Sequence, residues 1–239
     1  MTLLSMVNKA QDKLSLPRSS TVISSTDQIV RSLLAEADEE GKQLANRHPW
    51  QALIKEKTFT SVAQANQTNA LASDMGNPRR ILVDSIYNRT QKRRVTGPLT
   101  AAEWQNQQAL SLSLLVDSYY IRGGVWYASP TPPAGNTYAY EYVSSYWVDT
   151  NADGAGEAAS WQADTDTGVL SEDLMLLGIV WRYRASIGLG YAEEFNTYER
   201  EVIQAIMRDG QRRILNFAEN STFFSRDPRV YVPEGSWNI

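Results

Sequence analysis

Hydrophobic positions are densest between residues 171 and 187, in the stretch SEDLMLLGIVWRYRASI, where apolar side chains fall on every face of a predicted helix. A helix that is apolar all round is normally enclosed by other parts of a protein. Its acidic first turn and basic last turn suit the helix dipole, and Gly188 ends it. We therefore expect this helix to be the centre of packing, with Leu174, Leu177 and Trp181 as its core spine.

Three further helices are predicted from apolar positions spaced three or four residues apart. One begins near Tyr191 and buries the stripe that contains Phe195 and Tyr198. Residues 3–16 form another, with Thr2 as its N-cap and Pro17 as its stop. The third covers residues 26–48 and opens on a capping box made by Ser25 and Gln28. Residues 1–54 and 170–217 are accordingly predicted to form a helical bundle.

The middle of the chain, residues 55–169, alternates apolar and polar positions and predicts an antiparallel β-rich domain. We expect strands at 55–62, at 65–71 as its partner, and at 81–87. A hairpin turning at Gly123–Gly124 should share its sheet with a strand at 137–143. Thr100 and Glu103 predict a capping box and a short helix, and residues 110–116 suit either a strand or an extension of that helix. The fold class is therefore α+β, closed by an unpatterned C-terminal arm at 218–239.

Composition narrows the possible chemistry. Cysteine is absent and His48 is the one histidine, which argues against thiolate chemistry, Cys/His zinc sites and Ser-His-Asp triads. With no convincing set of acid, base and nucleophile, we expect neither an enzyme nor a cofactor. The net charge is −4, so the protein as a whole does not have the positive charge that is typical of nucleic-acid-binding proteins. No run of roughly 18 apolar residues predicts a membrane span, and the N-terminus lacks a signal-peptide pattern.

Two clusters of charge are candidates for binding. The basic cluster is Arg89, Lys92, Arg93 and Arg94, which suits weak contact with DNA phosphates, contact with a neighbouring subunit, or a plain solvated surface. The acidic loop DTNADGAGE, which starts at Asp149, resembles the beginning of a calcium loop. Its twelfth position is Ser160 rather than the expected glutamate, so a flexible acidic loop is the preferred interpretation.

The C-terminal arm carries aromatic residues without helical or strand periodicity. Such a segment either orders against a partner or frays at the chain end. As a contact segment it would use the aromatic side chains Phe223, Phe224, Tyr231 and Trp237.

Four segments occur in an order that resembles a known family. They are FTSV, ILVDSIYNRTQKRRVTGPLTAAEWQ, IRGGVWYASPTPPAGNTYAYEYVSSYWV and ADTDTGVLSEDLMLLGIVWRYRASIGLGYAEEFNTYE. Over about residues 50–202 the chain resembles the head-to-tail adaptor, or connector, proteins of tailed bacteriophages, particularly podovirus-like ones.

The resemblance implies a structural virion protein located in the neck and assembled in the host cytoplasm. About twelve copies would form a closed ring beneath the portal, link capsid to tail and surround the DNA exit channel. Expected partners are other copies of the chain, the portal protein, a tail or nozzle protein and passing double-stranded DNA. The aromatic arm would dock on the portal. The alternative from the residues themselves is a β-rich module that binds carbohydrate or calcium.

Overall fold

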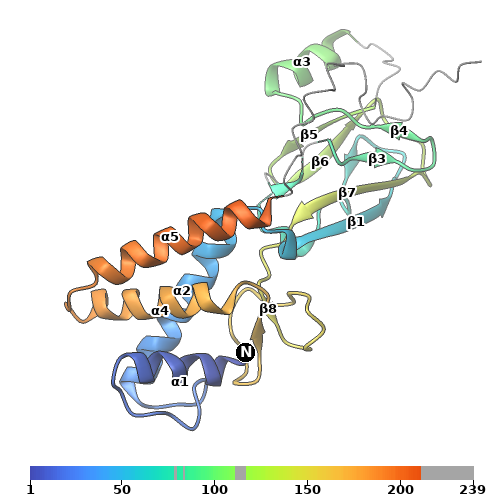
Figure 1. The fold of residues 1–239 in the computed structure, drawn as a ribbon. Coiled ribbons are helices and arrows are strands. Elements are labelled where there is room, and N and C mark those ends of the chain that lie inside the picture. The colour runs from blue at the N-terminus through green and yellow to red at the C-terminus, as the bar shows by residue number, and fades with distance from the viewer. Residues whose placement is uncertain (78–79, 83, 111–116, 211–239) are drawn as a thin grey trace, which may run out of the picture. The chain divides into compact units, whose positions relative to one another are not determined.

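The computed structural model describes residues 1–77, 80–82, 84–110 and 117–210. Within these ranges the chain is mixed α and β, with five α-helices and β-strands that pair antiparallel (Figure 1). The aromatic residues Phe223, Phe224, Tyr231 and Trp237 of the predicted arm lie outside the described residues, as does the predicted end of the bundle at 211–217.

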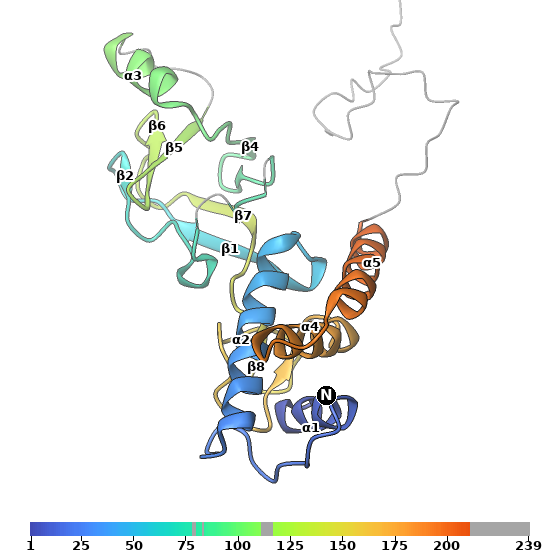
Figure 2. The same ribbon diagram turned by 90° about the vertical axis from the view of Figure 1, so that its left-hand side faces the viewer.

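Four helices pack on one another around α4 (Glu172–Ser186), the helix predicted from the densest apolar stretch. Its neighbours are α1 (Leu3–Lys13), α2 (Gln28–Arg47) and α5 (Ala192–Asp209), as Figures 1 and 2 show. Their buried side chains form one hydrophobic core, called here the helical core. The apolar surplus of α4 is therefore covered mainly by helices rather than by a sheet.

The helix ends follow local side-chain chemistry. Thr2 is the N-cap of α1, as predicted, and its hydroxyl accepts the Ser5 amide at 3.3 Å. The predicted capping box at Ser25 is wrong, because Asp27 is the N-cap of α2 and its carboxylate accepts the Ile29 amide at 2.9 Å. The predicted stop at Pro17 comes too late, since α1 ends at Lys13 and the backbone turns at Ser15 with a φ of 58°.

Two small sheets make up the β part, residues 54–143. The first has the order β1-β7-β3-β4, and the second has the order β2-β6-β5. Their strands are β1 (Ile54–Thr60), β2 (Asn66–Gln67), β3 (Tyr87–Asn88), β4 (Arg93–Arg94), β5 (Ser118–Arg122), β6 (Val125–Ser129) and β7 (Thr137–Val143). The turn at Gly123–Gly124 is confirmed, with φ angles of 59° and 73° that suit glycine. Helix α3 (Ala101–Leu110) opens on the predicted box, in which Thr100 and Glu103 exchange hydrogen bonds.

Three strand predictions are wrong. Strand β1 pairs with β7 and not with residues 65–71, of which Asn66–Gln67 pairs with β6 instead. Strand β7 lies in the opposite sheet from the β5–β6 hairpin. Of the predicted strand at 81–87, Tyr87 lies in β3 and Ile81 makes a single bridge to Tyr142.

An aromatic core lies between the two sheets, and the sequence pattern did not reveal that β7 and the β5–β6 hairpin lie on opposite sides of it. Trp126 of β6 stacks on Tyr119 of β5, with ring centroids 4.2 Å apart, and on Tyr140 of β7 at 5.7 Å. Phe59 of β1 stacks on Tyr138 at 5.3 Å. Strand β7 hydrogen-bonds to β1 and β3, whereas β6 hydrogen-bonds to β2 and β5, and these rings pack between the two sheets.

The segment that follows the β part packs with the helices. Trp147, Trp161 and Leu170 are buried in the helical core. Between them, β8 (Val148–Asp149) pairs with β9 (Thr167–Gly168). The structure thus divides the two cores near residue 144, whereas the sequence pattern placed the boundary at residue 169.

Candidate functional site

The predicted core spine is only partly enclosed. Leu174 is 4% exposed, whereas Leu177 and Trp181 are half-buried at the edge of the helical core. Trp181 is covered by aromatic side chains of the next helix, with ring centroids 5.0 Å from Phe195 and 6.0 Å from Tyr198. One side of α4 is therefore covered by aromatic packing that lies close to the surface.

A charged network inside the helical core links three helices. Glu40 of α2 is fully buried and accepts hydrogen bonds from Tyr198 Oη of α5 at 2.6 Å and from Arg182 Nε of α4 at 2.7 Å. Burial raises the pKa of the Glu40 carboxyl, although its two hydrogen bonds oppose that rise. Beside it, Arg47 pairs with Glu199 and lowers the pKa of that carboxyl. These charges are paired with one another, which favours a role in holding the helices together.

Glu40 was not predicted as a special residue, although a signal for it is present in the sequence. The residue follows Leu33 and Ala37 and precedes Leu44 on the apolar face of α2. A lone carboxylate at such a position needs a buried partner. Arg182, predicted only as a charge at the end of its helix, is that partner.

The α4–α5 hairpin exposes large apolar side chains in two places. At the turn, Ile187, Leu189 and Tyr191 are 51%, 55% and 43% exposed. On the outer face of α5, Ile203 and Met207 are 48% and 70% exposed and lie one helical turn apart. We call these five residues the hairpin patch. They make up five of the eight large hydrophobic side chains that are exposed in the described part of the chain.

The basic cluster lies on the β3–β4 hairpin, and its four members differ in whether they form ion pairs. Arg89 pairs with Glu56, and Arg94 pairs with Asp84. Lys92 and Arg93 are exposed and form no ion pair with any described residue. Two of the four cations are therefore partly neutralised by the protein itself.

The acidic loop after β8 brings together carboxylate oxygens of Asp149, Asp153 and Glu157, all within 4.8 Å of one another. Asp149 is 4% exposed, and its carboxylate accepts backbone amides from Ala152 at 2.7 Å and Gly154 at 2.8 Å. Although burial alone would raise the pKa of Asp149, these amides lower it. Backbone amides of the loop thus hold the Asp149 carboxylate in place. The flexible acidic loop preferred from the sequence, and calcium binding as its alternative, both stay predictions.

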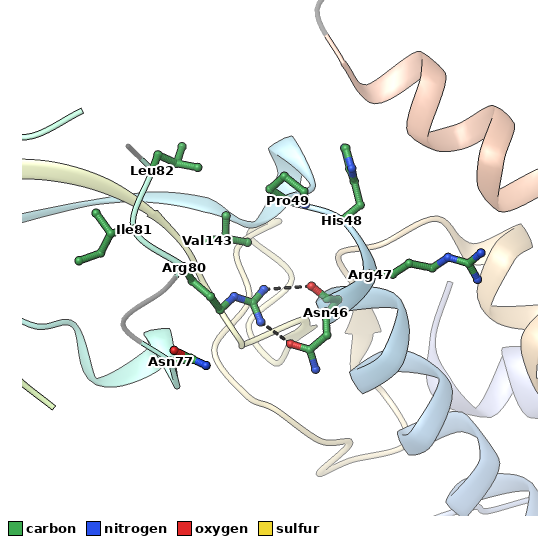
Figure 3. Close-up of a pocket in the computed structure, with 10 residues that line it drawn as sticks. Asn46, Arg47, His48, Pro49, Asn77, Arg80, Ile81, Leu82 and Val143 are labelled. Carbon is green, nitrogen blue, oxygen red and sulfur yellow. Dashed lines mark hydrogen bonds between the residues drawn. The ribbon is translucent and has the colours of Figure 1, made fainter. Parts of the chain in front are cut away.

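A cavity of about 490 Å³ lies where the end of α2 meets the β part (Figure 3). Residues 45–49 line one side, and Asn77, Arg80, Ile81, Leu82 and Val143 line the other. The Arg80 guanidinium donates to Asn46 Oδ1 at 2.7 Å, to the Ala45 carbonyl at 3.0 Å and to the Ser144 carbonyl at 2.9 Å. Two of these hydrogen bonds join Arg80 to residues on the opposite wall of the cavity.

No protein-family model matches the chain, and a search of curated proteins gives no match. Among the helices of the described ranges, none is both long enough and apolar enough to cross a membrane.

Proposed function

We propose that the chain is a structural subunit of a phage-like neck, a head-to-tail adaptor that assembles into a ring beneath the portal. About twelve copies would close such a ring by repeating one head-to-tail contact between neighbours. The ordered sequence segments within residues 50–202 support this proposal. In this assignment residues 1–54, together with the segment from residue 144 through α5, form the helical bundle of the ring, and residues 218–239 form its extended arm.

The hairpin patch is the observation that carries the proposal. The patch consists of two groups of exposed apolar side chains on one helical hairpin, and exposed apolar groups of this kind commonly mark an interface. Tyr191 and Met207 are residue types that interfaces favour. Contact with a neighbouring copy would remove these side chains from water.

The remaining assignments follow from the same proposal. The protein acts by assembly, without catalysis or a cofactor, in the virion neck after assembly in the host cytoplasm. The aromatic arm docks on the portal, a tail or nozzle protein binds the other end, and double-stranded DNA passes through the channel. Lys92 and Arg93 are the members of the basic cluster best placed to contact a phosphate or a neighbouring subunit.

Light scattering and electron microscopy of the purified full-length chain, with and without the portal protein, test the proposal directly. We expect a closed ring, either from the chain alone or on the portal. A strict monomer that also fails to associate when portal is added would overturn the adaptor assignment.

The acidic loop favours one alternative, a β-rich module that binds carbohydrate or calcium. The grouping of Asp149, Asp153 and Glu157 is its support. A ligand that binds only the folded state raises the unfolding temperature. A calcium-dependent rise that Asp153→Asn abolishes, in a chain that does not assemble, would favour this alternative over the ring.

A further inference from the structure

The described residues contain two separate hydrophobic cores. The helical core holds the buried apolar side chains of α1, α2, α4, α5 and the segment that follows β7, and the aromatic core holds those between the two sheets of the β part. No buried residue belongs to both of these clusters. Within the described residues, the β part reaches the helical core only beside the joint, through buried Val143 and partly buried Ile54 and Leu82. Bodies whose cores are otherwise separate can change their relative orientation with little exposure of either core. Contacts at the joint between the two bodies therefore determine their relative orientation.

Two chain crossings connect the cores. One runs from the end of α2 through Leu53 into β1, and the other leaves β7 at Val143 and reaches Trp147. The crossings are tied to each other, since the Ser144 amide donates to the Leu53 carbonyl at 2.8 Å. Both crossings therefore pass through one narrow region, which is the geometry of a hinge.

Arg80 connects the two sides of this region. It comes from the β part but donates to Ala45 and Asn46 at the last turn of α2, and also to Ser144 on the second crossing. The Ala45 carbonyl belongs to the helix end, where backbone acceptors lack partners within the helix. One half-buried guanidinium thus joins the end of α2 to the end of β7, beside the cavity in Figure 3.

The second arginine around the cavity is already engaged elsewhere. Arg47 pairs with Glu199 on α5, and His48 Nε2 lies 3.3 Å from Asp209 Oδ2. Both side chains are directed toward α5, which argues against an anion site in the cavity. Unfilled space beside a joint instead gives the two bodies room to move, because side chains there are not closely packed.

We propose that the joint at residues 45–54 and 143–147 is a hinge, and that Arg80 is the positioning residue that holds it in one orientation. Losing the guanidinium frees three acceptors at once, and water in the cavity can satisfy them. The cost therefore falls on the orientation of the β part rather than on either core. This inference does not depend on the adaptor assignment.

Distance measurement by pulsed electron paramagnetic resonance tests the hinge in the full chain. The sequence has no cysteine, so Arg31→Cys on α2 and Thr58→Cys on β1 place two spin labels at exposed positions without further changes. Mixing labelled chain with an excess of unlabelled chain removes distances between subunits. We expect a single narrow distance distribution in the labelled parent and a distribution at least about twice as wide with Arg80→Met.

Two further variants make the result decisive. Asn46→Ala removes one of the three acceptors and should broaden the distribution to an intermediate width. Arg122→Met removes a guanidinium of the same part that lies over the Tyr127 ring, away from the joint, and should leave the width unchanged. If Arg80→Met does not fold, as judged by circular dichroism, Asn46→Ala carries the test alone. A parent-like width in the folded Arg80→Met chain, or in Asn46→Ala when only that variant folds, would overturn the proposal.

Discussion

Gly178 of α4 lies directly against Glu40 of α2. A Cβ atom added at Gly178 would come within 2.1 Å of Glu40 Cδ, closer than any real contact. Glu40 has little freedom to move away, because Tyr198 and Arg182 both hold its carboxylate. The absence of a side chain at one residue of α4 thus makes room for a buried charge on α2.

Gly178→Ala should therefore destabilise the fold, although alanine is the better helix former. Alanine gains about 1 kcal/mol in helix propensity over glycine. Overpacking costs about 1–3 kcal/mol, and disturbing hydrogen bonds to a buried charge costs about 1.5–3 kcal/mol. We expect a net loss of about 2 kcal/mol in the free energy of unfolding, measured by urea denaturation.

Gly190→Ala is the matched control for this substitution. Gly190 is exposed, and an added Cβ would meet nothing within 4 Å. We expect a change within about 1 kcal/mol, in either direction. Equal stability of the two variants would show that Glu40 does not occupy the space opposite Gly178.

The charged network predicts opposite pH effects for two carboxylates. The folded-state pKa of Glu40 lies above its ordinary value of 4.5, so the folded protein binds this proton more tightly than the unfolded chain does. The contribution of Glu40 to stability is then full below pH 4.5 and is lost as the pH rises through the raised pKa. Glu40→Gln abolishes this loss. We expect the stability of Glu40→Gln relative to the parent to increase from about pH 4 to pH 7, measured by thermal unfolding at each pH.

Glu199→Gln should show the reverse trend. Arg47 lowers the pKa of Glu199, so this carboxylate stabilises the folded state above its ordinary pKa, and that contribution is lost as the pH falls. The variant should therefore fall further behind the parent as the pH rises over the same window. If the two variants changed in the same direction, the ion pair of Glu40 with Arg182 would outweigh its burial.

The sequence predicted the helices far better than the sheets. A helix is defined by periodicity and caps within its own residues, and α4 and the Thr100–Glu103 box were found in this way. The pairing of β1 with β7 joins Ile54 to Val143, and no local pattern specifies a partner so far along the chain. Alternation in β7 predicted a strand but could not say which side of the aromatic core it occupies.

The candidate sites show the same division. The basic cluster was visible as a run of charge, but which of its members form ion pairs depends on Glu56 and Asp84, which approach only in the folded chain. Likewise, the sequence predicted that α4 would be enclosed, yet could not show that Leu177 and Trp181 lie at the edge of the core. Ion pairing and the exposure of a helix face both depend on how separate elements pack together in the folded chain.

The hairpin patch predicts a test of assembly. Ile203→Glu combined with Met207→Glu places two charges where the adaptor proposal puts a neighbouring copy. Full burial of each parent side chain contributes about 1.5–3 kcal/mol. We expect self-association, measured by sedimentation, to weaken by at least about 100-fold while circular dichroism is unchanged.

Val62→Glu provides the control for the hairpin patch. Val62 is 44% exposed, similar to Ile203, but belongs to the β part. It should leave association within about threefold of the parent. Full association of the double variant would exclude Ile203 and Met207 from the subunit interface.

The ion pairs within the basic cluster predict which of its side chains would contact DNA. Lys92→Gln with Arg93→Gln removes the two charges that form no ion pair with described residues, whereas Arg89→Gln with Arg94→Gln removes two that are paired. Removing one cation that neutralises a phosphate reduces the slope of log K against log salt by about 0.9. If the cluster binds DNA, the first pair should reduce the slope for a short duplex by about 2, and the second pair by less than about 1.

Exposed ion pairs contribute about 0–1 kcal/mol, so both double variants should remain folded. Equal slopes for the parent and both variants would instead assign the cluster to a subunit interface or to plain surface.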